Sequence, residues 1–353
     1  MPLSERAQEP PGVSLGAAHA AGKQGQQAVA EAQGGDANAA FGPLRCRRVT
    51  RFLVTGGAGF IGSHIAHSLL DDGADVDVVD DLSTGARANV PAKAELIELD
   101  LGSAVERLPD RGYDAVLHLA GQSSGEKSFD DPLRDLDANA RSTLALALWA
   151  KARGVPVFLH GSSMGVYGQV SDPPVREDCE PRPISHYGAS KLAAEHSLRA
   201  MDTDGFRTLS FRMFSVYGPG QDLAELRQGM VSIYLTYILS GEPVAVRGPL
   251  DRVRDLIYID DVVAAWRAAL ERPARGALNL GAGEPVSVRQ LIDELAEACG
   301  LESGYPVDEQ PGTPGDQRAV WADISRAREE LGWEPRTPRA NGLAALVAWA
   351  RDS

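Results

Sequence analysis

Short apolar runs alternate with longer segments whose apolar residues recur at helical spacing, from residue 51 onward. The first run, residues 52–54, stops at a group of glycines, and residues 60–70 then carry apolar side chains at the spacing of one helix face. Runs of this length suit strands that are buried on both faces. Further runs of the same kind are residues 76–79, 95–99, 115–119, 156–159, 208–214 and 277–280. The pattern predicts an α/β fold, with a Rossmann-like doubly wound parallel sheet.

The same pattern divides the chain into three parts. Residues 1–48 are rich in Ala, Gly and Gln and lack the large apolar side chains that repay the entropy of ordering, so we expect a disordered N-terminal tail. A partner-binding role for this tail and an overextended start of the reading frame stay open as alternatives. Residues 49–215, rejoined by about 255–283, form the predicted Rossmann domain. Residues 216–254 and 284–353 are richer in Gly, Pro and turns, and we assign them to a smaller, discontinuous C-terminal lobe.

Charge and cysteine content exclude several classes of function. A formal net charge of −14 argues against a general binder of nucleic acid or membrane surfaces, because phosphate groups would repel the protein. Three widely separated cysteines form no metal or disulfide motif, and no His or Cys spacing predicts a metal site. No apolar run is long enough to span a bilayer, and no secretory signal precedes residue 49. We therefore expect a cytoplasmic protein without bound metal.

The loop GGAGFIG, residues 56–62, lies between the first predicted strand and the first predicted helix. Glycines at 56, 59 and 62 suit a tight turn, close approach of the backbone to a pyrophosphate, and close packing of helix on strand. The free N–H groups at the helix start can bind phosphates. A mere tight turn is the alternative, but the strand before and the helix after this loop favour a dinucleotide site.

Asp80 ends the second predicted strand, 18 residues after Gly62. A carboxylate there can accept both hydroxyls of a ribose and would repel a 2′-phosphate, so the sequence predicts NAD rather than NADP as the cofactor. Asp100, after the third strand, can accept from an adenine amino group, although a solvated acid at a strand end is nearly as good a reading.

Tyr187 and Lys191 lie four residues apart in the segment YGASK, on one face of a predicted helix. Free tyrosine has a pKa near 10, and nearby positive charge favours its phenolate. Lys191 together with the positive charge of a nicotinamide would supply it, so this pair predicts a general base. Ser163 follows a strand that would end at the nicotinamide, where its hydroxyl can bind a substrate oxygen.

Together these motifs resemble those of the extended short-chain dehydrogenase/reductases, in particular the nucleotide-sugar 4-epimerases of the NAD-dependent epimerase/dehydratase family. The resemblance covers about residues 50–350. The matching segments are GGAGFIG (56–62), DDLSTG (80–85), HLAG (118–121), Asn139, the serine pair 162–163, YGASK (187–191), YGPG (217–220), RDLIYIDD (254–261) and PGD (314–316).

The resemblance implies a role for each matching residue. Tyr187 is the expected acid and base at the sugar hydroxyl, Lys191 binds the nicotinamide ribose and tunes Tyr187, and Ser163 orients the substrate oxygen. The NAD site would be formed by Gly56, Gly59, Phe60, Ile61, Gly62, Asp80, Asp81, Asp100, Leu101, Leu119, Ala120, Asn139, Tyr187 and Lys191. The substrate would be bound by Ser124, Ser162, Ser163, Ser215, Arg247, Arg254 and Asp316.

Arg254 is the expected partner of the substrate diphosphate, because a guanidinium group matches phosphate with two hydrogen bonds. A surface ion pair with Asp251 is the alternative. The chain departs from the family at three positions of the nucleotide-sugar pocket. Ser215 replaces an asparagine, Thr313 an arginine and Arg247 an aromatic residue, so Arg247 is expected to stack on a base or to supply the missing phosphate contact.

The resemblance implies a UDP-hexose 4-epimerase. Alternatives are a 4,6-dehydratase, a uronate decarboxylase or a 2-epimerase on the same scaffold, and a non-catalytic NAD-binding module. Related dehydratases carry an acidic pair after the active-site hydroxyl residue, where this chain has Met164 and Gly165. A homodimer is expected through the apolar helices around Leu144 and Leu192.

Overall fold

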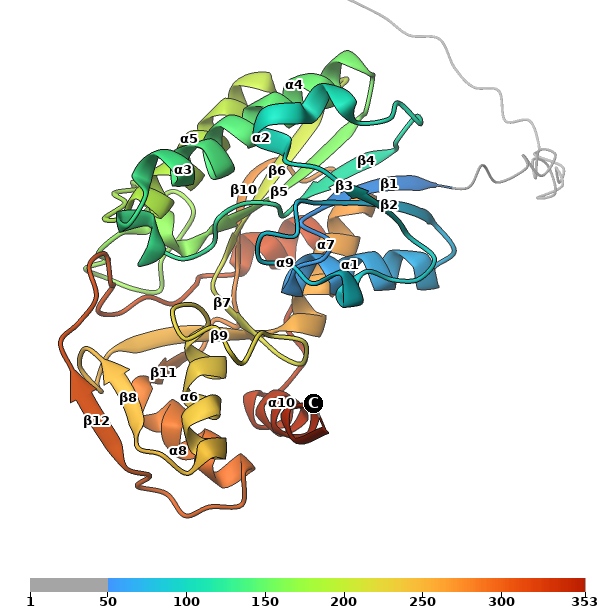
Figure 1. Ribbon diagram of the computed structural model, residues 1–353. Helices are drawn as coiled ribbons and strands as arrows, with labels where there is room; N and C mark the ends of the chain where they lie inside the picture. Colours follow the sequence, from blue (N-terminus) through green and yellow to red (C-terminus); the bar gives the residue numbers. More distant parts are fainter. Residues whose placement is uncertain (1–49, 353) are drawn as a thin grey trace, which may run out of the picture. The chain divides into compact units, whose positions relative to one another are not determined.

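In the computed structural model, which describes residues 50–352, seven parallel strands form one sheet in the order β3–β2–β1–β4–β5–β6–β10 (Figure 1). The strands are β1 (Arg51–Thr55), β2 (Asp75–Asp80), β3 (Glu95–Glu98), β4 (Ala115–His118), β5 (Val157–Ser163), β6 (Arg207–Met213) and β10 (Gly276–Leu280). Each of the apolar runs predicted as strands is found in this sheet, which confirms the doubly wound parallel fold. The strand order reverses between β1 and β4, and ligands of such sheets bind at the carboxyl ends of the strands near this reversal.

Helices cover both faces of the sheet (Figure 1). One face is packed by α1 (Phe60–Asp71), α7 (Ile259–Glu271) and α9 (Ser325–Leu331). The other face is packed by α2 (Leu101–Ala104), α4 (Ser142–Ala152) and α5 (His186–Met201). Because both faces are buried, the strands read as continuous apolar runs rather than as an alternation of apolar and polar residues.

Short helical segments lie between the longer strands and helices. They are η1 (Arg87–Asn89), η2 (Val105–Arg107), η3 (Lys127–Phe129), α3 (Pro132–Leu136), η4 (Asp137–Arg141) and η5 (Met164–Tyr167). The segment η4 is a π-helical turn that joins α3 to α4, and the buried Asn139 lies within it. Single π turns inside helices occur frequently at functional sites.

The remaining elements surround a second hydrophobic core. A three-stranded sheet has the order β11–β9–β7, and β8 pairs in parallel with β12. These strands are β7 (Ser215–Tyr217), β8 (Val244–Arg247), β9 (Val253–Tyr258), β11 (Pro285–Ser287) and β12 (Val307–Gln310), and the helices are α6 (Met230–Ser240), α8 (Val288–Ala298) and α10 (Arg339–Asp352). In α8, Ser287 caps the Gln290 N–H at 3.1 Å, and apolar residues at 288, 291, 292 and 295 face this core.

Helix α9 differs from the predicted division of the chain. It lies within residues 284–353, which we assigned to the smaller lobe, yet Ala327, Leu331 and the following Trp333 pack in the core of the seven-stranded sheet. Trp333 Nε1 donates to the Asp261 carbonyl at 2.9 Å, which ties this segment to α7. The other boundaries of the lobe stay a prediction, and the predicted tail, residues 1–48, lies outside the described residues.

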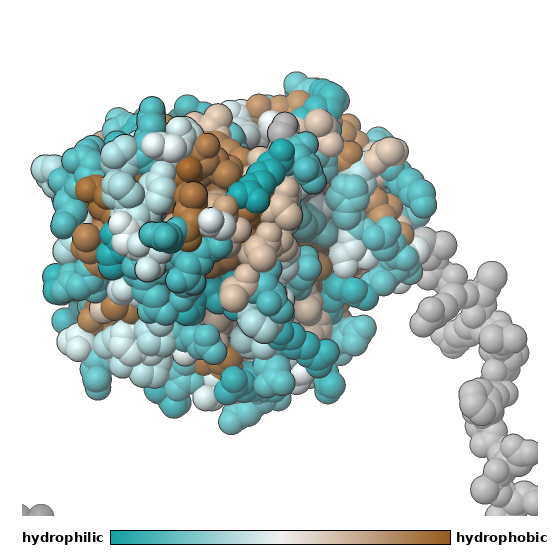
Figure 2. Space-filling model, turned by 90° about the horizontal axis from the view of Figure 1, so that it is seen from below, coloured by the Kyte–Doolittle hydropathy of each residue, from teal (hydrophilic) through white to brown (hydrophobic). Residues whose placement is uncertain are grey.

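Hydrophilic residues dominate the face shown in Figure 2, where hydrophobic residues form small separate groups. Within residues 50–352, none of the helices combines the length and the apolar character needed to cross a membrane.

Candidate active site

The glycine loop is pressed against the end of β4. Gly56 has a positive φ of 68°, and a Cβ atom there would lie 2.6 Å from the Ala120 nitrogen. A Cβ atom on Gly62 would lie 2.2 Å from the Gly56 carbonyl oxygen, so the first turn of α1 packs directly on the loop. No side chain caps α1 at Gly59, which leaves its first N–H groups available to an anion. Gly56 and Gly62 therefore require glycine for the tight turn and the close packing of the first helix, and the predicted approach of a pyrophosphate at Gly59 stays a prediction.

Asp80 stabilises this loop from the end of β2. Its carboxylate accepts from the Ala58 N–H and from the Leu82 N–H, both at 2.9 Å. Burial raises the pKa of Asp80, and the two backbone N–H groups oppose that effect. Each carboxylate oxygen keeps a second lone pair, so the group can also accept from a ribose. Neighbouring Asp81 is exposed and accepts from the backbone and hydroxyl of Ser83.

Asp100 and Leu101 stand where β3 passes into α2. Asp100 accepts from the Gly102 N–H at 2.9 Å and caps the helix, while Leu101 is buried in the core on that face of the sheet. The hydrogen bond to Gly102 explains the position of Asp100 without any ligand. Its predicted contact with adenine stays a prediction.

Asn139 has a buried side-chain oxygen that accepts no hydrogen bond from the described residues. Its amide nitrogen donates to Asp135 at 3.2 Å, and a Cβ atom on Gly121 would lie 2.4 Å from its oxygen. Buried polar atoms in native proteins are normally paired, so this oxygen indicates a missing donor such as a water or a ligand group.

These features fit a dinucleotide. The crowded glycine loop, the uncapped start of α1, the Asp80 carboxylate and the unpaired Asn139 oxygen all lie near the carboxyl edge where the strand order reverses. Residues of the loop would contact the pyrophosphate, and Asp80 the adenosine ribose. A bound NAD would supply a hydride acceptor at its nicotinamide ring.

Tyr187 and Lys191 lie in the first two turns of α5. Ser185 begins the helix by accepting the Gly188 N–H at 3.1 Å, which places Tyr187 in the first turn. The Lys191 Nζ lies 5.9 Å from the centre of the Tyr187 ring and donates to the Gly161 carbonyl on β5 at 2.9 Å. Ser163, at the end of β5, lies close enough to the Tyr187 phenol for its hydroxyl to lower the pKa of that group. The structure thus brings together the three residues predicted to be catalytic.

Burial decides the charge state of the Tyr187 phenol in the protein alone. It raises the pKa of Tyr187 to about 12, against the lowering effect of the Ser163 hydroxyl. Burial likewise lowers the pKa of Lys191 to about 8. Burial therefore favours the neutral phenol in the protein alone. The expectation that Lys191 and the positive charge of a bound nicotinamide together favour the phenolate stays a prediction.

In the smaller lobe, two buried arginines share one carboxylate. Arg254 and Arg252 each donate to a different oxygen of Asp316, and each is 6% exposed. Arg252 also donates to the Arg247 carbonyl at 2.7 Å, and its buried Nε has no partner among the described residues. The alternative that Arg254 pairs with Asp251 is wrong, because Asp251 pairs with Arg318 instead.

The other residues predicted to bind substrate differ in their surroundings. Ser124 is buried and donates to the Arg227 carbonyl at 2.9 Å, and Ser162 is buried and donates to Glu195. Ser215 is half-buried on β7. Arg247 is exposed and donates to both oxygens of Glu126 at 2.8 Å. These hydrogen bonds do not test whether Arg247 stacks on a nucleotide base or contacts a phosphate, and both stay predictions.

Sequence analysis missed three buried charged groups near the site. Arg252 precedes Arg254 by two residues, the spacing of one strand face, and this spacing was a signal that could have found it. Asp135 lies four residues before Asn139, on the adjoining helical segments. Glu195 forms a buried ion pair with Arg212 of β6 at 2.7 Å, and no local pattern reports a contact between these two elements.

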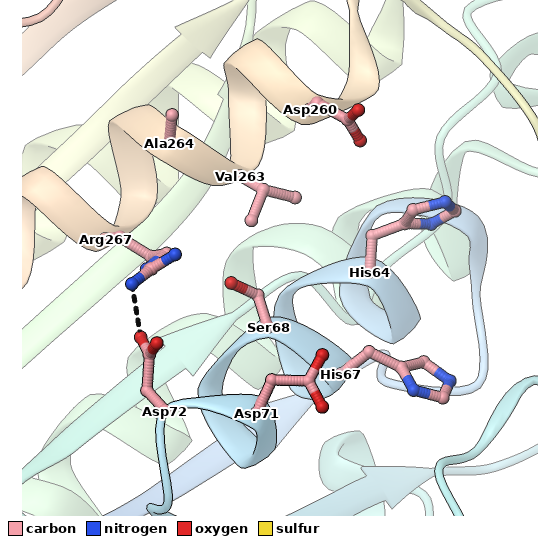
Figure 3. Close-up of a pocket in the computed structure, with 9 residues that line it drawn as sticks. All are labelled: His64, His67, Ser68, Asp71, Asp72, Asp260, Val263, Ala264 and Arg267. Carbon is pink, nitrogen blue, oxygen red and sulfur yellow. Dashed lines mark ion pairs between the residues drawn. The ribbon is translucent and has the colours of Figure 1, made fainter. Parts of the chain in front are cut away.

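A cavity of about 400 Å³ between α1 and α7 lies apart from this chemistry (Figure 3). An Asp72–Arg267 ion pair crosses it, and His64, Asp71 and Asp260 project around it. None of its lining residues belongs to the glycine loop or to the Ser163, Tyr187 and Lys191 group. Residues 50–352 contain no cluster of three or more His, Cys, Asp or Glu side chains suited to a metal ion.

The sheet, the glycine loop and the Ser163, Tyr187 and Lys191 group together define a dinucleotide-binding enzyme of the short-chain dehydrogenase/reductase type. The family model described as the NAD dependent epimerase/dehydratase family matches residues 52–281. The chain belongs to this family, whose enzymes depend on NAD.

Several relatives support the assignment over most of the chain. The UDP-glucose 4-epimerase of Mycolicibacterium smegmatis is 36% identical, with 86% of this chain and 99% of the relative covered. The crystal structure of UDP-glucose 4-epimerase with UDP-glucose from Thermotoga maritima has a TM-score of 0.81 and 36% identity, over 86% of this chain and 99% of that one. The Thermus thermophilus UDP-glucose 4-epimerase complex with NAD has a TM-score of 0.80 and 35% identity, over 86% and 100%.

Relatives with other reactions are similar at nearly the same level. A GDP-6-deoxy-D-mannose reductase of Pseudomonas aeruginosa is 33% identical over 84% of this chain and 96% of the relative. An NAD-dependent NDP-hexosamine 5,6-dehydratase has a TM-score of 0.78 and 30% identity, over 86% of this chain and 98% of that one. Overall similarity therefore identifies the family, and the choice of reaction depends on the site.

Proposed function

We propose that this protein is a nucleotide-sugar 4-epimerase with a UDP-hexose as substrate. The observation that carries the proposal is the Ser163, Tyr187 and Lys191 group at the carboxyl edge of the sheet, next to the glycine loop. The two positions directly after Ser163 hold neither an acid nor a base. Relatives named UDP-glucose 4-epimerase support the choice of substrate.

In the proposed reaction Tyr187 takes the proton of the sugar C4 hydroxyl, and a bound NAD would supply the acceptor for the C4 hydride. Ser163 donates a hydrogen bond to the C4 oxygen and holds it next to Tyr187. Lys191, fixed by the Gly161 carbonyl, supplies part of the positive charge that stabilises the Tyr187 phenolate, and the nicotinamide ring of a bound NAD would supply the rest. After the 4-keto sugar has turned over, the same cofactor would return the hydride to the other face of C4, and Tyr187 returns the proton to the oxygen. The sugar is oxidised and then reduced at C4 within one catalytic cycle, so the reaction requires no external reductant.

Elimination of water requires more than this group provides. Removing water across C5 and C6 needs a base at C5 and an acid at the C6 hydroxyl. Met164 and Gly165 follow Ser163, and neither side chain transfers a proton. The Met164 side chain packs on a hydrophobic cluster with Val166 and Val320. This favours epimerisation over dehydration, and the intact catalytic group disfavours a non-catalytic NAD-binding module.

The test is to incubate the protein with UDP-glucose and follow product mass, product stereochemistry and absorbance near 340 nm together. The proposal expects UDP-galactose of unchanged mass without accumulation of NADH. Loss of water, loss of carbon dioxide or stoichiometric NADH would assign one of the alternative reactions. If UDP-glucose does not react, a chromatographic screen of UDP-, dTDP-, GDP- and CDP-sugars identifies the nucleotide.

We further propose a cytoplasmic homodimer. The surface of α3 and α4 exposes Leu133, Leu136, Leu144 and Leu148, by 75%, 48%, 37% and 55%, and a second copy would cover these side chains. Leu192 of α5, predicted with Leu144 to lie at this interface, packs on a hydrophobic cluster within the chain. Sedimentation at micromolar concentration should give a dimer, and a monomer would refute this part of the proposal. The cytoplasmic location rests on the three cysteines, which form no paired motif.

A further inference from the structure

Asp135 is a buried carboxylate in the active site with no role in the reaction described above. It lies in α3 and is 1% exposed. One of its oxygens accepts from the Ser190 hydroxyl at 2.6 Å. The other accepts from the Gln122 amide at 2.7 Å and from the Asn139 amide at 3.2 Å. Three donors from three different segments converge on this carboxylate.

No cationic side chain of the described residues forms an ion pair with Asp135, which distinguishes it from the other buried carboxylate near Lys191. Glu195 also lies on α5, but Arg212 neutralises it through an ion pair at 2.7 Å. Lys127, in the neighbouring η3, pairs with Glu225. Burying a charge without a partner is costly, so an unpaired buried carboxylate calls for a compensating charge nearby.

Lys191 is the buried cation that follows Ser190, the residue whose hydroxyl donates to Asp135. Burial lowers the pKa of Lys191 to about 8, and Asp135 first, then Glu195, raises it. Two buried histidines lie on the sheet side of Lys191, and burial lowers the pKa of both His118 and His160, so that they are neutral at pH 7. Of the two buried carboxylates near Lys191, Glu195 is neutralised by Arg212, whereas Asp135 forms no ion pair with an arginine of the described residues.

We propose that Asp135 is a positioning residue, the counter-charge that keeps the buried Lys191 ammonium ionised and orients the Asn139 amide. Through Ser190 it is joined to the residue before Lys191, and through Asn139 to the π-helical turn whose side-chain oxygen has no partner. The inference rests on the proposed function only in so far as Lys191 takes part in the reaction. The charge of Lys191 itself can be measured without substrate.

Asp135→Asn removes the charge and preserves the shape. The asparagine oxygen can still accept from Gln122 and Asn139, and its amide group can donate to the Ser190 hydroxyl. Ser190 already has an alternative acceptor, the Tyr187 carbonyl at 2.9 Å. The matched control is Asp137→Asn, two residues further along. Asp137 is exposed and makes only a long pair with Arg141 at 3.8 Å, so the same change of charge there is screened by water.

The chain suits a direct measurement because it has five lysines, at positions 23, 93, 127, 151 and 191. The protein is labelled with ¹³C at the lysine Cε, and its NMR signals are followed from pH 6 to 11, with Lys191→Arg identifying the Lys191 signal. In Asp135→Asn the midpoint of Lys191 should fall by about one pH unit. In Asp137→Asn it should stay where it is in the unchanged protein.

An unchanged Lys191 midpoint in Asp135→Asn would overturn the proposal, as would an equal shift in Asp137→Asn. If Asp135→Asn does not fold, Asp135→Ser, which also removes the charge, should give the same downward shift. With an active substrate, the alkaline limb of kcat/KM should move to lower pH in Asp135→Asn. A merely structural role would lower kcat without moving that limb. Because the NMR titration contains no substrate, its outcome is independent of whether the protein is a 4-epimerase.

Discussion

Arg254 of β9 and Arg252, which directly precedes β9, donate to the two different oxygens of a single carboxylate, that of Asp316. Two buried guanidinium groups with one carboxylate leave one positive charge without compensation. A diphosphate is the complementary partner for such a site, since guanidinium groups bind phosphate oxygens in pairs. Arg252 thereby provides a second arginine in the lobe where the resemblance led us to expect an arginine at position 313 and the chain has Thr313.

Replacing either arginine should weaken substrate binding. Arg252→Met and Arg254→Met should each raise the KM for a UDP-hexose by about tenfold or more, because each removes a charge-assisted hydrogen bond. NAD binding should not change. The control is Arg318→Met, since Arg318 is exposed and pairs with Asp251. An equal rise of KM in the control would show that general charge, and not this pair, attracts the substrate.

Tyr187→Phe should abolish most turnover and preserve the fold. The change is nearly isosteric, so the free energy of unfolding should move by less than about 1.5 kcal/mol. Without the phenol no group is left to take the C4 proton, because the Ser163 hydroxyl and the Lys191 ammonium do not act as the base. Steady-state rates, with NAD binding and urea denaturation alongside, check this prediction. Near-normal turnover would mean that another group is the base.

The protein should bind NAD more tightly than NADP. Asp80 would repel a 2′-phosphate, and exposed Arg87, the cation nearby in sequence, is already paired with Glu98. Calorimetric titration of the cofactor-free protein with each dinucleotide measures the difference. Asp80→Ser should narrow it by raising the affinity for NADP, and tighter binding of NADP to the unchanged protein would contradict the assignment of Asp80.

His118 should make the stability fall as the pH falls. Burial lowers its pKa to about 3, while the unfolded chain takes up the proton near 6.5. Between these values the unfolded state binds more protons, so the free energy of unfolding decreases from pH 6.5 downward, by about 2 kcal/mol at pH 5. Urea denaturation at several pH values gives the free energy of unfolding as a function of pH, and this dependence should be less steep in His118→Asn. The same dependence in both proteins would mean that His118 takes up its proton equally in the folded and the unfolded state.

The sequence by itself determined the sheet and the catalytic group. All seven strands of the main sheet were predictable, because a strand buried on both faces must be apolar throughout. The glycine loop and the Tyr187–Lys191 pair were predictable because residues close in sequence fix their geometry, a turn in one case and one helix face in the other.

The tertiary structure determined which charged groups pair with one another and how far they are removed from water. Asp316 lies some 60 residues from Arg252 and Arg254, Glu195 meets Arg212 between a helix and a strand, and Asp135 reaches Ser190 across 55 positions. The direction of the pKa shift of Tyr187 also depends on how completely the packed chain removes water from the phenol. Pairing and desolvation are properties of the space around a side chain. That space is formed by segments distant in sequence, and no local pattern records it.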